Sequence, residues 1–288
     1  MRNRSSLLLP REHGAYAQLA FPLTTGLALT PPSAAALALG AAAVCLFLAN
    51  EPLSILLGTR GVRLREQQGA RARVRAGILL GSGAAFGVMG VASGWPAVWP
   101  RILVPALAGL LLVPLALTGR QKSLPGEFLV LTAFSTLVLP LAAASGADPI
   151  RPVLAAGVWW ISFGLGTLEV HAVKARIKRT ARNRWTRWAS PLAAGATVAA
   201  AMWVAMGQAG PLLRRAARAA SGFLGPFAGS VLDSELPRLL PPAAAALLPP
   251  ALAIFVLSLI RVHPRHLKRV GWTLVAVNFL TLILLLQG

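Results

Sequence analysis

The stretch SAAALALGAAAVCLFLANEPLSILLGT, residues 33–59, decides what kind of protein this chain folds into. A helix needs about 20 mostly apolar residues to cross the hydrocarbon core of a bilayer. This run exceeds that length, and Glu51, close to its end, is its one charged residue. A dense group of arginines follows between residues 60 and 75. The stretch therefore predicts a transmembrane helix that ends where the arginines begin.

Runs of the same character recur along the whole chain and predict about nine spanning helices in all. Their ranges are 16–30, 33–59, 76–94, 102–118, 125–146, 152–173, 191–208, 241–260 and 270–287. Glycine and proline occur inside several runs, which helices in lipid tolerate because their neighbours satisfy the backbone groups. The predicted fold class is all-α: a polytopic bundle of transmembrane helices that forms a single membrane domain over residues 1–288.

The composition supports a membrane protein and argues against a nucleic-acid binder. Only 12% of the residues are charged, against about 25% in a soluble domain. The net charge is +20, but the basic residues form short islands between the apolar runs, where they set orientation and meet anionic lipid head groups. Cys45 is the only cysteine, which excludes a disulfide framework and a cysteine-based metal site within the chain.

The distribution of Lys and Arg predicts the orientation in the membrane. If the N-terminus is cytoplasmic, 22 of the 28 basic residues fall on the cytoplasmic side, as the positive-inside rule requires. The six outer ones are Arg101, Arg151, Arg214, Arg215, Arg218 and Arg238. We therefore expect a multi-pass protein of the cell membrane with its N-terminus inside and its C-terminus outside.

Residues 210–240 form the one sizeable stretch that is not predicted to span. Its apolar residues share a helical face, opposite a second face of arginines. The apolar face comprises Leu212, Leu213, Ala216, Ala220, Phe223 and Leu224, and the arginines are Arg214, Arg215 and Arg218. The stretch predicts an amphipathic connector on the outer interface, with a lid over a site as the alternative.

Four of the eight acidic residues, Glu12, Glu51, Glu127 and Glu169, lie near the predicted cytoplasmic ends of helices. Acids at membrane depth cost about 2.5–3.5 kcal/mol on insertion scales, and they persist where they pair, face a cavity or bind a ligand. Each acid here has polar neighbours in the sequence. We therefore predict a shared polar pocket lined by His13, Asn50, Glu51, Glu127, Glu169 and His171.

Structural ion pairs are the alternative explanation for each acid taken singly. Glu51 would pair with Arg60 or another basic residue of the loop, and Glu127 with Lys122. Glu169 would pair with Lys174 or Arg176. The sequence leaves both explanations open.

An acid followed by a basic stretch occurs twice. Asn50 and Glu51 precede the arginines of residues 60–75, and Glu169 precedes the basic residues 174–187. The repetition suggests a duplicated membrane unit, and such repeats commonly place a site at their interface.

Several segments resemble the YwiC-like membrane proteins. The opening PREHGAY, residues 10–16, matches their Pro-x-x-His-Gly-Ala-aromatic pattern, with Tyr16 where Trp is usual, and is followed by an apolar run with Pro22. SLPGE at residues 123–127 and the basic stretch 170–179 are similar to the family's middle part. The resemblance implies a polytopic membrane protein and assigns no activity.

A more distant resemblance is to the UbiA-type prenyltransferases, which implies a nine-helix scaffold with acidic motifs after helices two and six. There acids hold Mg²⁺, which grips a prenyl diphosphate. Glu51 and Glu169 would be the metal ligands here, and Arg63, Lys174 and Arg176 would attract phosphate. Neither junction carries the Asn-x-x-x-Asp-x-x-x-Asp pattern, so the resemblance leaves prenyl transfer in doubt.

The leading hypothesis is a protein that binds a lipid or isoprenoid through its anionic head group in a cytoplasmic-side pocket. A small-solute or proton-coupled transporter is the second hypothesis, because duplicated halves and membrane-edge acids fit it. A membrane assembly partner without catalysis is the third. Membrane lipids are partners in the first hypothesis, and nucleic acid is a partner in none.

Overall fold

The computed structural model describes residues 8–9, 13–178, 184–206, 236–260 and 267–287, and these are helical apart from short turns. The chain divides into two compact units, Met1–Ala147 and Asp148–Gly288. We describe each unit by itself. The prediction that both form a single membrane domain stays a prediction.

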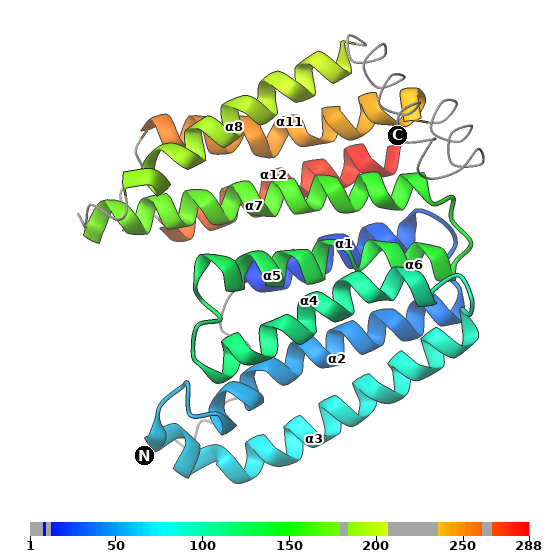
Figure 1. Ribbon diagram of the computed structural model, residues 1–288, viewed down its shortest axis with the longest axis vertical. Helices are drawn as coiled ribbons and strands as arrows, with labels where there is room; N and C mark the ends of the chain where they lie inside the picture. Colours follow the sequence, from blue (N-terminus) through cyan, green and yellow to red (C-terminus); the bar gives the residue numbers. More distant parts are fainter. Residues whose placement is uncertain (1–7, 10–12, 179–183, 207–235, 261–266, 288) are drawn as a thin grey trace. The chain divides into compact units, whose positions relative to one another are not determined.

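Unit 1, Met1–Ala147, has six helices in its described residues, of which α2 and α3 form a long antiparallel pair (Figure 1). The helices are α1 (His13–Ala28), α2 (Ala34–Leu56), α3 (Val62–Ser93), α4 (Trp99–Leu117), α5 (Leu124–Ser135) and α6 (Val138–Ala144). α1 packs on α5 and α6, and α4 packs beside α5. Leu39, Val98 and Leu141 form a core cluster at the end of the unit that lies opposite Glu51.

Unit 2, Asp148–Gly288, has four described helices, with α11 packed against the other three (Figure 1). The helices are α7 (Ile150–Lys178), α8 (Arg184–Ala205), α11 (Leu236–Ile260) and α12 (Leu267–Gln287). Leu165, Ala194, Ala251 and Ile254 form the core where α7, α8 and α11 meet. Of the predicted connector, residues 210–240, the part up to residue 235 lies outside the described residues. Its last five residues, 236–240, belong to α11.

Eight helices in the described ranges are long and apolar enough to cross a membrane, with α5 and α6 together forming one of them, Leu124–Ala144. α1, with 16 residues, is shorter than each of these eight spans. Large apolar side chains such as Leu110, Val88 and Ile260 are exposed on the outward faces, as lipid-facing residues should be. The predicted all-α, multi-pass bundle is confirmed, while its orientation and the choice of the cell membrane stay predictions.

Most exposed tryptophans of the described residues lie near helix ends, as they do in proteins whose tryptophans mark the bilayer interface, and Trp160, within α7, is the exception. In unit 1, Trp95 lies in the turn between α3 and α4 and Trp99 opens α4, and their rings are in contact at a tilt of 32° with centroids 5.7 Å apart. In unit 2, Trp188 and Trp272 lie in the first turns of α8 and α12, and Trp203 near the other end of α8.

Two helices depart from the predicted apolar runs for local reasons. α3 begins at Val62 instead of residue 76, because the Arg, Gln, Glu and Ala residues before the apolar run are good helix formers. The run 125–146 breaks between Ser135 and Val138. Pro140 cannot donate a hydrogen bond to the carbonyl of Thr136, so the helical ladder is interrupted there.

The close approach of α3 to α2 depends on a stripe of small residues. Ala72, Ala76, Gly83 and Gly90 are the buried residues of α3. A Cβ on Gly90 would lie 2.6 Å from Leu39 Cγ and 3.0 Å from the carbonyl oxygen of Ala35. Small residues allow such contacts between membrane helices, where dispersion rather than the hydrophobic effect drives association.

We predict that Gly90→Ala lowers the stability of the protein by about 1–3 kcal/mol, the usual cost of overpacking a core. The added methyl group meets both the Leu39 side chain and the backbone of Ala35. The midpoint of thermal unfolding in detergent, followed by tryptophan fluorescence, measures the change.

Gly81→Ala is the matched control, because its Cβ would meet nothing within 4 Å in the same helix. There the higher helix propensity of alanine should raise stability by up to about 1 kcal/mol. Equal shifts in the two variants would contradict the packing explanation.

Candidate functional site

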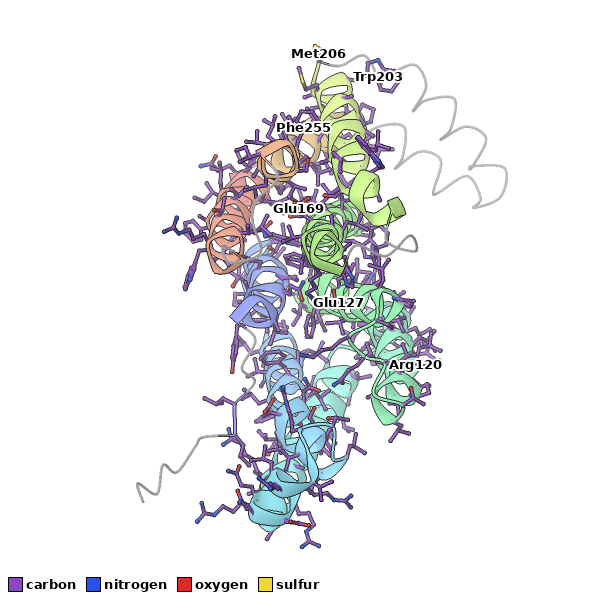
Figure 2. All side chains as sticks on the ribbon, turned by 90° about the vertical axis from the view of Figure 1, so that its left-hand side faces the viewer. Arg120, Glu127, Glu169, Trp203, Met206 and Phe255 are labelled. Atoms are coloured by element: carbon purple, nitrogen blue, oxygen red, sulfur yellow. The ribbon has the colours of Figure 1, made fainter. Side chains whose placement is uncertain are left out.

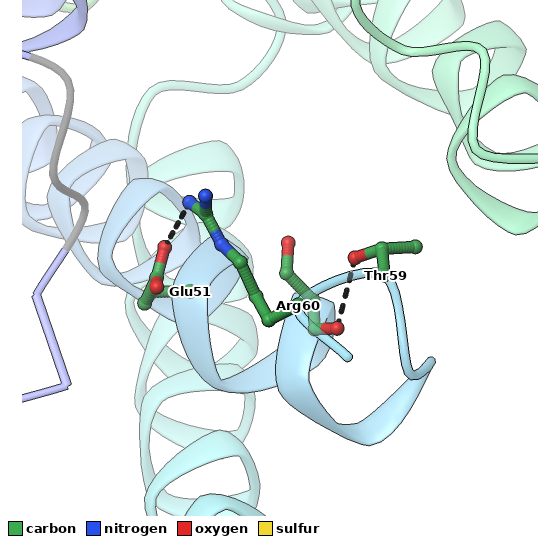
Figure 3. Close-up of polar contacts among 4 residues, drawn as sticks. Glu51, Thr59 and Arg60 are labelled. Carbon is green, nitrogen blue, oxygen red and sulfur yellow. Dashed lines mark hydrogen bonds and ion pairs between the residues drawn. The ribbon is translucent and has the colours of Figure 1, made fainter. Parts of the chain in front are cut away.

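An ion pair joins the last turns of α2 to the loop that follows it. Arg60 Nη2 donates a hydrogen bond to Glu51 Oε2 at 2.5 Å, and the Glu51 residue is only 3% exposed (Figure 3). Gly58 and Gly61 flank Arg60 with φ angles of +75° and +100°, which glycine adopts without strain. These two turns return the chain toward α2, so that Arg60 can reach the buried carboxylate. The predicted pairing of Glu51 with Arg60 is confirmed.

Arg60 keeps hydrogen-bonding capacity beyond this pair. Its side chain is 28% exposed, and the guanidinium carries five N–H donors. Its Nε is buried and has no hydrogen-bond partner in the described part of the chain. Below it, Thr59 Oγ1 donates to the carbonyl of Ser54 at 2.9 Å and holds the turn (Figure 3). Arg60 is thus a partly exposed cation whose position is set by a buried acid.

Three aromatic rings bring α1, α2 and α5 together one turn from Glu51. Tyr16 packs edge-on against Phe47 with centroids 5.0 Å apart, and Phe47 packs edge-on against Phe134 at 5.9 Å. We call these three residues the aromatic cluster. Phe47 and Glu51 are four residues apart on α2 and share a helix face. The aromatic cluster therefore lies beneath the Glu51–Arg60 pair, on the membrane side.

The aromatic contacts also place the start of α1 beside the Glu51 end of α2. His13 opens α1 three residues before Tyr16; its side chain lies outside the described residues, as does Glu12. Asn50 is exposed while Glu51 is buried, so the two neighbours face different sides of α2. The structure brings the start of α1 and Glu51 to the same end of unit 1. Asn50 does not lie on the buried face of α2 that carries Glu51.

Glu127 lies in the first turn of α5, in the SLPGE segment (Figure 2). Ser123 caps this helix by accepting a hydrogen bond from the Gly126 amide at 3.4 Å, and a carboxylate in a first turn is favoured by the helix dipole. A Cβ on Gly126 would lie 2.5 Å from the carbonyl oxygen of Gln121. Glu127 is half-buried, and its predicted pairing with Lys122 stays a prediction.

In unit 2, Glu169 is fully buried among the helices (Figure 2). Its Oε2 accepts a hydrogen bond from Ser190 Oγ at 2.6 Å, which ties α7 to the first turns of α8. Lys174 is exposed, and the side chain of Arg176 lies outside the described residues. Sequence reasoning missed Ser190. Its position directly before the apolar run 191–208 was the available signal.

A second buried polar contact lies deeper in unit 2. Ser162 Oγ donates to Asn278 Oδ1 at 2.5 Å, between the middle of α7 and the middle of α12. A search confined to acids and histidines missed both residues, although Asn278 is an amide in the middle of the final apolar run. Ser162 lies two turns of α7 from Glu169, so this unit buries polar side chains at two depths.

The remaining predicted residues are at the surface or half-buried. Arg63 is exposed in the first turn of α3, and His171 is half-buried on α7. Across the described residues, no three His, Cys, Asp or Glu side chains gather as metal ligands would. Glu51 and Glu169 belong to different units, and each already accepts a hydrogen bond from a protein group. A Mg²⁺ site shared between them stays a prediction.

Comparison with known proteins agrees with the predicted family. Residues 9–144 match the family model described as YwiC-like protein. The match covers the described part of α1 and all of α2 to α6, and it includes PREHGAY and SLPGE. No curated protein and no solved structure matches the chain.

Glu51→Gln should destabilise unit 1 by about 1–3 kcal/mol, because it leaves Arg60 without its charged partner. The double variant Glu51→Gln/Arg60→Gln should lose less stability than the sum of the two single variants. Unfolding midpoints of all three variants in detergent measure this coupling.

Glu66→Gln is the control, since it removes one exposed acid from the neighbouring α3. It should change stability by less than about 0.5 kcal/mol. Additive losses in the Glu51 and Arg60 variants would show that the pair contributes nothing to folding.

Gly126→Ala should displace the loop before α5, because the new Cβ meets the backbone of Gln121 and Arg120. We expect a loss of about 1–3 kcal/mol in unfolding free energy and faster proteolytic cleavage of that loop. Gly109→Ala on α4 has open space around its Cβ and serves as the control. A wild-type cleavage rate in Gly126→Ala would contradict the close contact.

Proposed function

Taking this chain as a YwiC-like multi-pass membrane protein, we propose that it binds a lipid or isoprenoid through its anionic head group, on the predicted cytoplasmic side of unit 1. The observation that carries the proposal is Arg60, a partly exposed guanidinium held at the end of α2 by the buried Glu51. A fixed guanidinium is a strong partner for phosphate, because its planar fork loses little freedom on binding.

The surroundings of Arg60 suit an amphiphile. The aromatic cluster lies on the membrane side of the ion pair. Phe47 is buried within it, and the half-buried Tyr16 and Phe134 offer apolar surface to the first part of a hydrocarbon chain. Arg63 lies one turn further along, at the start of α3, and adds positive potential that attracts an anion to this end. Head group and chain would thus meet matching surfaces within a few turns of α2.

Binding, rather than prenyl transfer, is the proposal. Within unit 1, Glu51 is already engaged by Arg60, so it serves to position the guanidinium instead of holding a metal. Arg60 contacts the head group, and Glu51 is a positioning residue. The UbiA-like scaffold remains a prediction from the resemblance.

Transport of a small solute or of protons is the second candidate, favoured by the buried polar residues of unit 2. Glu169 with Ser190 and Ser162 with Asn278 lie at successive depths along α7. Buried polar groups in a membrane interior commonly mark substrate or proton paths. A proton leak or solute uptake by vesicles carrying the protein, abolished by Glu169→Gln, would favour transport over lipid binding.

Farnesyl phosphate and farnesol are probes that differ only in the anionic head group. Native mass spectrometry of the purified protein should show preferential binding of the phosphate. Arg60→Gln should weaken that binding at least about tenfold, the loss expected when a charge-assisted hydrogen bond is removed. Glu51→Gln should weaken it less, because the guanidinium is present but no longer fixed.

Arg60→Lys and Glu66→Gln complete the design. Lysine keeps the positive charge without the planar guanidinium, so Arg60→Lys should retain part of the affinity for farnesyl phosphate. Substitution of the exposed Glu66 should not change that affinity. Equal binding of farnesyl phosphate and farnesol would overturn the proposal, as would unchanged affinity in folded Arg60→Gln.

A further inference from the structure

α3 carries a groove that the proposed function does not use. Its described lining residues all belong to one stripe of this helix, and the groove is shallow and wide open to its surroundings, with a volume of about 620 Å³. The lining residues are Ala70, Arg71, Val74, Arg75, Ile78 and Leu79. They recur at the spacing of a single helix face. The groove thus runs along α3 and passes from charged to apolar residues.

The change of character along the groove coincides with the edge of the apolar part of α3. Arg75 is the last charged residue of α3. Beyond it, Ile78 is 62% exposed, and Val74, on the turn before, is 65% exposed. Arg71 and Arg75 lie one turn apart on this face, so both guanidiniums can reach the head-group level while the apolar residues meet hydrocarbon.

The two arginines are not neutralised by the protein. Neither forms an ion pair with any carboxylate among the described residues. Glu66, the only acid of α3, lies more than a turn away from Arg71. Ala72 and Ala76, which alternate with the arginines, are buried toward α2. Arg71 is exposed and Arg75 is half-buried, so the two arginines lie on a side of α3 other than the one packed against α2.

We propose that this groove binds an anionic phospholipid of the bilayer, with the phosphate between Arg71 and Arg75 and an acyl chain along Val74, Ile78 and Leu79. Charge complementarity identifies the occupant: two guanidiniums that pair with no carboxylate among the described residues attract an anion, and the exposed Val74 and Ile78 beside them contact a chain. The site goes beyond the proposed function, because its ligand is a membrane lipid at the outer surface of α3 and not the ligand held at Arg60.

Lipid titrations in native mass spectrometry test the site, with phosphatidylglycerol and phosphatidylcholine of identical chains as probes. The protein should bind phosphatidylglycerol preferentially. Arg71→Gln/Arg75→Gln should reduce that preference on the order of tenfold, since each basic residue near a membrane surface contributes about a several-fold factor.

The matched control is Arg65→Gln/Arg73→Gln, which removes the same charge from α3. By helical spacing, Arg65 and Arg73 lie on other faces of α3 than the groove. This variant should retain most of the preference. An equal loss in both double variants would overturn the proposal, because binding would then follow total charge instead of the groove.

Two further measurements separate the remaining explanations. Ile78→Ser should weaken both lipids alike, because it removes chain contact and leaves the arginines in place. Arg71→Gln/Arg75→Gln should leave farnesyl phosphate binding unchanged, and Arg60→Gln should leave the phosphatidylglycerol preference unchanged. A retained preference in Arg71→Gln/Arg75→Gln, or a change from monomer to dimer when the groove arginines are removed, would overturn the lipid assignment.

Discussion

A charged side chain in hydrocarbon needs a partner or a path to water, and the cost of having neither governs this structure. On α3 the arginines stop at Arg75, and only uncharged residues continue into the apolar part of the helix. On α2 the acid Glu51 is buried, and two glycine turns bring Arg60 back to it. The ends of the spans and the loop that follows α2 are therefore consequences of one energetic requirement.

Within the membrane, shape replaces hydrophobicity as the source of helix association. Lipid chains solvate leucine as well as a neighbouring helix does, so close contact must come from small residues. Gly83 and Gly90 let α3 approach α2 at Leu46 and Leu39. This pairing positions the arginine-bearing end of α3 beside the Glu51–Arg60 pair. The packing between the apolar parts of α2 and α3 therefore determines where their polar ends lie.

Arginine plays two different parts at this end of unit 1. Arg60 is held by a buried carboxylate, which fixes its geometry and reduces its net charge, and this suits selective recognition of one head group. Arg71 and Arg75 keep their full charge and face outward from α3, which suits looser binding of any anionic phospholipid. In unit 2 the corresponding acid, Glu169, is bound by a neutral serine, so the two acid-then-basic junctions differ in chemistry.

The spans, the helical class and the arginine-rich ends were determined by the sequence alone, because the transfer of each helix into lipid depends on that helix's own residues. The pairing of Glu51 with Arg60 could also be predicted, since the two residues are separated by a single short turn. Only the tertiary structure decided that Ser190 binds Glu169, that Asn278 binds Ser162 and that Asn50 faces outward. Those contacts depend on how each helix is rotated about its axis and on which helix it packs against. A run that is apolar on all faces of the helix indicates neither the rotation nor the neighbouring helix.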